Sequence, residues 1–440
     1  MGTDERMLKE LGVQSVDELF SDIPPSVLVE EIDLPDGLSE MEVIDRVRSM
    51  LDKNLTAADR PCFLGGGIYH HFVPSAVTSI ISRSEFLTSY TPYQAEISQG
   101  MLQALFEYQS FIAELTGMEA VNSSNYDGAT ALGEAATMCH RISSKSKFLI
   151  PEAISWDKRS VLNNYAKGIG MRVIDYGFDP LTGEADLADL RSKVDGDVAG
   201  IYIEVPNFLG VIDRRATEVK REFPDPVLVV GVDPISLGVL KAPADYGADI
   251  VIGEGQSLGS PMSFGGPLLG LFGCRQEHVR RMPGRVIGMT RDASGKRAFS
   301  MTLQTREQHI RREKATSNIC SNEALMAVAA SVYLSVVGRD GLRALARLNM
   351  ERAKATVDAI CSLDGYECPT LGSFHFNEFA VRTPIGPEKL AKMLLGKGII
   401  GGLPLTRHVP AMGDCMLFAA TELTTDDDIA RLIAALGEAS

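Results

Sequence analysis

The stretch that decides the fold is ADIVIGEGQSLGSPMSFGGP, residues 248–267. It begins with a β-rich run, continues into a polar loop and ends in Gly-Gly-Pro, after which a second apolar run covers residues 268–272. Upstream, the segment VLVVGVDP, residues 227–234, has the composition of a buried strand and contains Asp233 at its end. The sequence therefore places Asp233 at the carboxyl end of a parallel strand, where ligands bind in such sheets.

This order of strand, aspartate, strand, polar loop and Gly-Gly-Pro resembles that of fold-type I pyridoxal-phosphate enzymes. In that class the aspartate pairs with the pyridine nitrogen, and a lysine in the polar loop forms the Schiff base. The resemblance makes Asp233 the pyridine partner, with an ordinary turn aspartate before proline as the alternative, and it puts Gln256 at the lysine position. A glutamine amide forms no imine, and covalent catalysis of this type needs a free amine. We therefore expect no Schiff-base chemistry at Gln256.

A second candidate part of the site is the helix start in AVNSSNYDGATALGEAATM, residues 120–138. Backbone amides at a helix N-terminus bind anions, and the helix dipole helps them. The same resemblance puts a cofactor phosphate against Gly128, Ala129 and Thr130. The alternative is an ordinary helix start with Asp127 as N-cap. Together with Asp233 and Gln256 these positions form a degenerate cofactor pocket, which we expect to be empty.

Strand and helix patterns alternate from Met118 onward, which favours a mostly parallel sheet covered on both faces. The expected class is α/β with the fold-type I architecture. Its parts are an N-terminal helical arm (1–60), a large α/β domain (61–320), and a connecting helix with a small C-terminal α/β domain (321–440). The predicted strands of the large domain are residues 147–151, 171–177, 199–207, 227–234, 248–253 and 267–273.

Helical patterns are expected at both ends of the chain. In the arm, apolar residues recur at helical spacing, namely Met41, Ile44, Val47 and Leu51. Long helical patterns run from Thr305 to about Ser362. In the last helix, Thr425 and Asp428 form a capping-box pattern.

Composition excludes several classes of function. The 440 residues carry a formal charge of −15 and no long Lys/Arg run, which argues against a nucleic-acid partner. Seven cysteines without a CxxC pair indicate buried thiols in a reducing compartment, and no zinc spacing occurs. The acidic N-terminus lacks an apolar stretch, and the apolar run 324–338 is shorter than the roughly 20 residues of a membrane span. We expect a cytoplasmic protein without a metal or a membrane segment.

Four long motifs together carry a more specific resemblance: residues 63–77, 86–136, the Gly-Gly-Pro loop and residues 305–320. They resemble the P-protein, glycine dehydrogenase (decarboxylating), of the glycine cleavage system, in the form split into two homologous chains. The similarity covers nearly the whole chain. It implies that this chain corresponds to the N-terminal half of the fused enzyme and is inactive alone. The lysine and its pyridoxal phosphate are then in a homologous partner, with two copies of each chain in the complex.

The reaction that the resemblance implies is the decarboxylation of glycine and transfer of the aminomethyl group to the lipoyl arm of the H-protein. Our hypothesis is that one loop reaches across the heterodimer interface and forms part of the partner's cavity wall. Its residues are Tyr90, Thr91, Tyr93, Gln94 and Glu96.

Cations gather in the motif of residues 305–320, where an acidic protein has reason to bind an anionic ligand or a partner subunit. They are Arg306, His309, Arg311, Arg312 and Lys314. The alternative is a solvated helical face of mixed charge.

Two other functions stay open from the sequence. An independent aminotransferase or desulfurase-like enzyme would need another lysine, but neither Lys241 nor Lys314 has the right place. A purely structural or regulatory subunit would never touch substrate.

Overall fold

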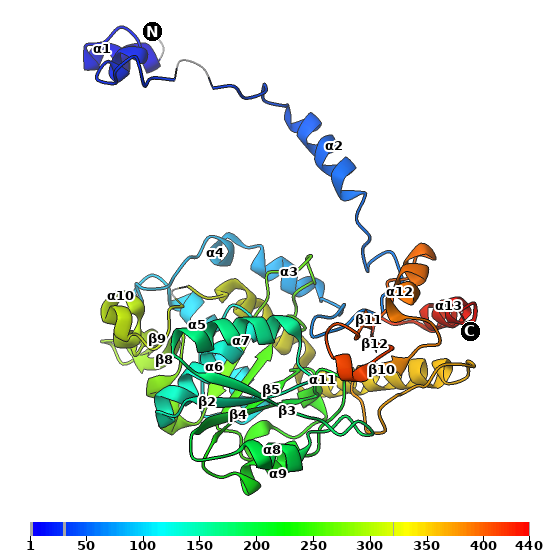
Figure 1. Cartoon of the computed structure of the whole chain (residues 1–440). Coiled ribbons are helices and arrows are strands. Elements are labelled where there is room, and N and C mark those ends of the chain that lie inside the picture. The colour runs from blue at the N-terminus through cyan, green and yellow to red at the C-terminus, as the bar shows by residue number, and fades with distance from the viewer. Residues whose placement is uncertain (1–2, 30–31, 320, 440) are drawn as a thin grey trace. The chain divides into compact units, whose positions relative to one another are not determined.

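The computed structural model describes residues 3–29, 32–319 and 321–439 and divides into two compact units, Met1–Thr56 and Ala57–Ser440 (Figure 1). The first unit contains α1 (Thr3–Leu11), η1 (Asp17–Phe20) and α2 (Glu40–Leu51). Ser39 caps α2, because its hydroxyl accepts from the Glu42 amide and the Glu42 carboxylate accepts from the Ser39 amide. The predicted apolar stripe of α2 is present, but Met41, Ile44, Val47 and Leu51 are all exposed.

The second unit is built on a sheet in which, among the described residues, seven strands have the order β1-β7-β6-β5-β4-β2-β3. Strands β2 to β6 pair in parallel, with β3 at one edge, whereas β7 and β1 pair antiparallel. The bounds are β1 (Ala120–Val121), β2 (Lys147–Pro151), β3 (Arg172–Tyr176), β4 (Val198–Val205), β5 (Val227–Val232), β6 (Ile250–Glu254) and β7 (Gly270–Cys274). The mostly parallel sheet predicted from the alternating pattern is confirmed.

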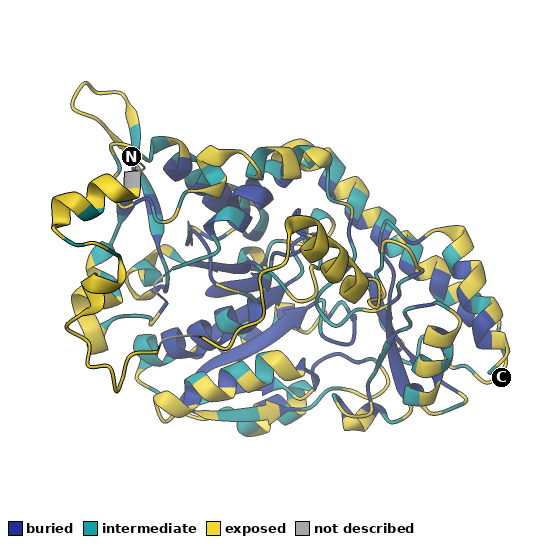
Figure 2. Cartoon of the chain, turned by 90° about the horizontal axis from the view of Figure 1, so that it is seen from above, coloured by how far each residue is buried: buried dark blue, intermediate teal, exposed yellow. Residues whose placement is uncertain are grey.

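Both faces of this sheet are covered, and Figure 2 shows its central strands as buried, whereas the edge strand β3 is partly exposed. Along β5 the side chains alternate: Leu228 and Val230 join the cluster of one face, and Val227 and Val229 join the other. The second face is packed mainly by α6 (Gly128–Ser143) and α7 (Trp156–Gly168). Further helices contribute to the first face: α3 (Ser75–Ile81), α5 (Gln99–Thr116), α8 (Leu187–Lys193), α9 (Ala216–Glu222) and α11 (Ala324–Ile360).

Helix α11 is interrupted at Gly338, whose φ of 64° and ψ of 179° are not helical. Within the described residues it is the one helix long and apolar enough to cross a membrane, but half of its most apolar stretch is buried in the protein. Residues Ala327–Ala330 are almost fully inaccessible, as expected of a core helix.

The expectation of long helices beyond Thr305 is wrong for residues 305–319 and 321–323. This segment forms short pieces, including η5 (Gln304–Arg306), α10 (Gln308–Arg311) and η6 (Arg312–Lys314). It follows the hairpin of β8 (Val286–Arg291) and β9 (Arg297–Thr302). The many charged residues here offer no apolar stripe that packing could stabilise, so the helical pattern has nothing to bury.

A three-stranded antiparallel sheet follows α11. Its strands are β10 (Glu378–Arg382), β11 (Leu403–Pro404) and β12 (Cys415–Ala419). Two helices complete this part of the chain, α12 (Pro387–Gly396) and α13 (Asp426–Gly437). The predicted capping box is confirmed, because the Thr425 hydroxyl accepts from the Asp428 amide and the Asp428 carboxylate accepts from the Thr425 amide. The predicted boundary at residues 320 and 321 lies inside the second unit and stays a prediction.

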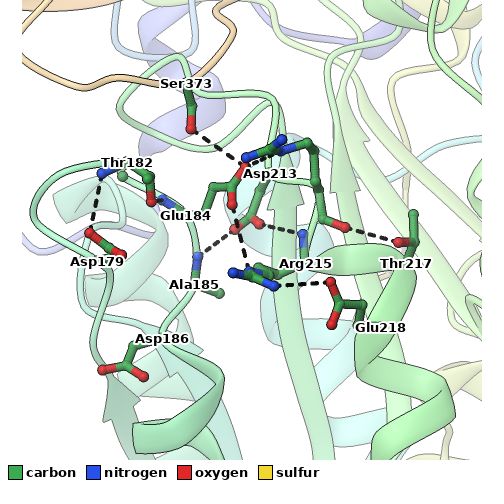
Figure 3. Close-up of polar contacts among 12 residues, drawn as sticks. Asp179, Thr182, Glu184, Ala185, Asp186, Asp213, Arg215, Thr217, Glu218 and Ser373 are labelled. Atoms are coloured by element: carbon green, nitrogen blue, oxygen red, sulfur yellow. Dashed lines mark hydrogen bonds and ion pairs between the residues drawn. The ribbon is translucent and has the colours of Figure 1, made fainter.

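A buried polar cluster fixes the segment that leads into β10 (Figure 3). Glu184 is 2% exposed, pairs with Arg214 at 2.6 Å from Nε, and has Ser373 Oγ at 3.4 Å. Asp213 accepts from the backbone amides of Ala185 and Arg215, both at 2.9 Å. Burial raises the pKa of Asp213 to about 6. Through Ser373 the cluster joins the segment before β10 to Glu184, and β10 begins at Glu378.

Candidate functional site

Gly128 and Asp233 line one cavity of about 60 Å³ at the carboxyl ends of β4, β5 and β6. This is the edge of the sheet where the sequence predicted a site. Four carboxylates line the cavity, namely Glu204, Asp233, Glu254 and Glu378. The one lysine among its lining residues is Lys158. The volume suits a few water molecules, and the charge is that of an acidic pocket.

Glu254 occupies the anion position at the start of α6. Its Oε2 accepts from the Gly128 amide at 2.9 Å, and its Oε1 accepts from the amides of Gln256 and Leu269, both at 2.9 Å. Burial raises the pKa of Glu254 to about 7, although these three amides favour the charged form. Of the amides predicted to hold a phosphate, that of Gly128 is therefore used by a carboxylate of the chain itself.

The rest of the helix start is an ordinary cap. Asp127 Oδ1 accepts from the Thr130 amide at 2.6 Å, and the Thr130 hydroxyl accepts from the Asp127 amide at 3.1 Å. Asp127 is thus the N-cap that sequence analysis gave as the alternative. Ala129 is buried, and neither Ala129 nor Thr130 lines the cavity.

Gln256 does not line the cavity either. Gln256 is only 1% exposed. Its Nε2 donates to the carbonyls of Ser260 at 2.6 Å and Tyr69 at 3.1 Å. Its Oε1 accepts from the Tyr69 amide at 3.2 Å. The amide joins Tyr69, which follows the glycines at residues 65–67, to the polar loop, so the residue that replaces the expected lysine has a structural role.

Glu378 enters the cavity from β10. Its Oε2 accepts from the Tyr69 hydroxyl at 2.7 Å and its Oε1 from the Gly66 amide at 2.6 Å. A Cβ at Gly65 would lie 2.0 Å from Oε1, so this approach requires glycine. Burial raises the pKa of Glu378 to about 7.

Lys158 is an amine that sequence analysis missed, and it comes from α7. It is ion-paired with Glu204, whose Oε1 also accepts from the Tyr202 hydroxyl at 2.6 Å. Burial opposes its charge, but the attraction of Glu204 prevails and the pKa of Lys158 is raised. A charged amine is no nucleophile. Lys241 and Lys314, the lysines considered from sequence, do not line the cavity.

The residues of this cavity do not fit pyridoxal phosphate. A phosphate would meet Glu254 at the start of α6, and Lys158, the lysine among the lining residues, is held by Glu204. Asp233 accepts from the Ile235 amide at 2.8 Å through Oδ1, as a turn aspartate does, and its Oδ2 has no partner among the described residues. Lys158 offsets the charge of Glu204, but Glu254 and Glu378 repel an anionic cofactor whenever they are ionised.

The loop that contains Tyr90 and Tyr93 is anchored by Arg285, which is 6% exposed. Arg285 donates to the Tyr93 hydroxyl at 3.0 Å and to Asn322 Oδ1 at 3.1 Å. The hydroxyls of Tyr90 and Ser321 are 2.9 Å apart. Tyr90 and Tyr93 are 75% and 45% exposed. Of the other residues of the loop, Thr91 is half-buried, and Gln94 and Glu96 are exposed.

The cations of residues 305–320 do not converge on one ligand. Arg306 donates to the carbonyls of Met282, Gly284 and Leu303, so it is a structural residue. Arg311 donates to the Thr305 carbonyl at 3.1 Å. The remaining three are dispersed: the His309 ring packs edge-on against Tyr93, Arg312 lines a second cavity, and Lys314 is exposed. No cluster of three or more His, Cys, Asp or Glu suited to a metal ion occurs in the described ranges.

Comparison with known proteins places this site in context. A family model described as glycine cleavage system P-protein matches residues 2–436. The probable glycine dehydrogenase (decarboxylating) subunit 1 of Thermococcus onnurineus is 48% identical over 99% of this chain and 97% of that relative. A crystal structure of glycine decarboxylase (P-protein) of the glycine cleavage system, in inhibitor-bound form, superposes with a TM-score of 0.92 at 38% identity, covering 100% of this chain and 99% of that one.

More distant structures share the fold alone. The apo cysteine desulfurase of Thermococcus onnurineus has a TM-score of 0.64 at 15% identity and covers 89% of this chain and 97% of that one. The fold-type I architecture predicted from the strand, aspartate and loop order is thereby confirmed.

Proposed function

Since this chain belongs to the glycine cleavage system P-protein family, we propose that it is the subunit of a glycine dehydrogenase (decarboxylating) that holds no cofactor of its own. A homologous, lysine-bearing partner supplies pyridoxal phosphate and the Schiff base, and two copies of each chain assemble in the cytoplasm. The cofactor serves as the electron sink for glycine decarboxylation, and the lipoyl arm of an H-protein takes the aminomethyl group.

One observation carries the proposal. Glu254 uses the Gly128 amide that a cofactor phosphate would need, and Gln256 is 1% exposed and bonded to backbone. The cavity lined by Gly128 and Asp233, which we call the vestigial cavity, is therefore stabilised by internal contacts and has no amine free for catalysis. A chain of this family built in this way depends on a second polypeptide for its chemistry.

Exposed apolar surface supports a partner. Tyr90 and Ile97 are 75% and 80% exposed in and beside the tyrosine loop, and Phe264 in the Gly-Gly-Pro loop is 78% exposed. Tyrosine and phenylalanine are enriched in the cores of protein interfaces. In this proposal the loop of Tyr90, Thr91, Tyr93, Gln94 and Glu96 forms part of the partner's cavity wall, held in place by Arg285.

The test is reconstitution. We expect no exchange of labelled carbon dioxide into glycine from this chain alone, and full exchange when it is mixed with the lysine-bearing partner and H-protein. Exchange by the purified chain, or an imine to pyridoxal phosphate trapped by borohydride on it, would instead show an independent enzyme. A partner that is fully active alone would reduce this chain to a structural subunit.

A further inference from the structure

A second cavity, of about 390 Å³, lies between α6, α7 and residues 308–318, outside the cavity that contains Asp233. Its size falls within the roughly 300–1,000 Å³ of small-molecule sites. Charged and polar side chains line it, including Glu134, Arg141, Tyr165 and Arg312. We call it the Glu134 cavity.

Two buried polar atoms at this cavity have no hydrogen bond of full geometry among the described residues. Glu134 is 1% exposed, and its Oε1 accepts from Ser317 Oγ at 2.6 Å. Its Oε2 has no such bond, although the Tyr165 hydroxyl lies close enough to favour the charged form of Glu134. Arg141 donates through Nη2 to the Arg281 carbonyl at 3.2 Å, but its buried Nε is unpaired. Buried polar atoms are nearly always paired. A ligand that carries both an acceptor and a donor would complement Arg141 and Glu134 at this cavity.

Local packing explains why the cavity exists. A Cβ at Gly133 would lie 2.7 Å from the ring of Tyr165, so glycine at this position lets α7 approach α6 closely beside Glu134. The opposite wall carries Arg312, whose φ of 53° and ψ of −122° are unusual for a residue other than glycine. Such a conformation is strained for a residue that carries a Cβ.

The charges of the cavity select the ligand. The titratable and charged groups that face Glu134 are Arg141 on the same helix, Tyr165 on α7, and Arg312 and Glu313 on η6. Burial raises the pKa of Glu134 to about 7, against the opposing effects of Ser317 and Arg141. Guanidinium groups prefer carboxylates, and an ionised Glu134 prefers an ammonium group.

We propose that the Glu134 cavity binds a free α-amino acid as a zwitterion, with its carboxylate against Arg141 and Arg312 and its ammonium group against Glu134. Glycine is the first amino acid to test, a choice that rests on the proposed function; the site itself does not rest on it.

The experiment is titration calorimetry on the full chain without its partner. The probes are glycine, alanine and serine, with acetate and methylammonium as half-ligands that carry one charge each. Glycine binds at least about tenfold more tightly than either half-ligand. Glu134→Gln keeps the shape and weakens glycine binding roughly tenfold, the expected loss of one charged hydrogen bond. Glu107→Gln, an exposed carboxylate on α5, leaves binding unchanged.

Arg312→Gly is a second variant, which keeps the test valid if Glu134→Gln fails to fold. It removes the guanidinium and relieves the strained backbone, so the chain stays at least as stable while glycine binding weakens. Binding of a zwitterion strengthens as the pH rises through about 7, because Glu134 becomes ionised. A site for a plain carboxylate would show the opposite trend.

Three results overturn the proposal: no binding of glycine, alanine or serine; acetate bound as tightly as glycine; or glycine binding unchanged in both Glu134→Gln and Arg312→Gly. The exchange assay with the partner tests the proposed function separately, because the titration uses a chain that has no exchange activity.

Discussion

The guanidinium of Arg285 donates a hydrogen bond to the hydroxyl of Tyr93 at 3.0 Å, and it is 6% exposed although Tyr93 is 45% exposed. A buried cation thus positions an exposed tyrosine ring. The same guanidinium reaches Asn322 at 3.1 Å, so the tyrosine loop and the segment before α11 are fixed together.

The first prediction concerns this loop. Tyr93→Phe removes the hydrogen bond and keeps the ring, so we expect a loss of about 0.5–1.5 kcal/mol in the free energy of unfolding and retained exchange activity. Tyr93→Ala removes the ring as well and lowers activity of the reconstituted pair at least about tenfold, as does Glu96→Ala. Urea unfolding of the single chain separates the effect on stability from that on activity. Unchanged turnover in both alanine variants would show that the loop does not line the partner's cavity.

The second prediction is that Gln256→Lys restores no cofactor chemistry. The new ammonium would lie where an amide is bonded to Ser260 and Tyr69, and Glu254 would still use the Gly128 amide. Loss of the buried amide bonds costs on the order of 1–3 kcal/mol. We expect no visible absorbance with pyridoxal phosphate and no borohydride-trapped adduct by mass spectrometry. The lysine-bearing partner is the positive control, and an adduct in the variant would refute our account of the cavity.

The third prediction is a pH dependence of stability. The pKa of Glu378 is raised from its ordinary value of 4.5 to about 7 in the folded chain. Because the folded state holds the proton more tightly, this stabilisation is fully present below pH 4.5 and is lost as the pH rises through 7. At about 1.4 kcal/mol per unit, the loss is on the order of 3 kcal/mol.

Urea unfolding at pH 5, 6 and 7.5 checks this. Glu378→Gln flattens the decline, since glutamine does not titrate, but a slope remains because burial also raises the pKa of Glu254 to about 7. Glu114→Gln, an exposed carboxylate on α5, is the matched control and leaves the slope as it was. Equal slopes in wild type and Glu378→Gln would mean that Glu378 is ionised at neutral pH.

The sequence predicted the elements whose signals are local. The buried run of residues 227–232 reads as a strand because each residue is apolar, and Thr425 with Asp428 reads as a cap because both partners lie within one turn. It also predicted that Gln256 forms no Schiff base, since that follows from the chemistry of an amide.

The contacts that fill the vestigial cavity were not predictable in this way. Gln256 forms a hydrogen bond with Tyr69, which lies 187 positions away in the sequence. Glu378 accepts a hydrogen bond from the Tyr69 hydroxyl, 309 positions away. Such pairings depend on how the sheets pack, which no local pattern records. Glu254 does carry a local signal, because it ends an apolar strand at the ligand-binding edge, where a carboxylate competes with a phosphate for backbone amides.

The last prediction tests the break in α11. Gly338 has φ 64° and ψ 179°, a conformation open almost only to glycine, and a Cβ there would meet no atom within 4 Å. Any cost of Gly338→Ala therefore comes from the backbone, and we expect a loss of about 1–3 kcal/mol in the free energy of unfolding. Gly396→Ala in α12 is the matched control, because its Cβ also meets nothing but its φ is not positive. That variant gains up to about 0.5–1 kcal/mol. Urea midpoints measured for both variants decide the matter: if Gly338→Ala is as stable as Gly396→Ala, α11 tolerates a continuous helix and the break is not imposed by packing.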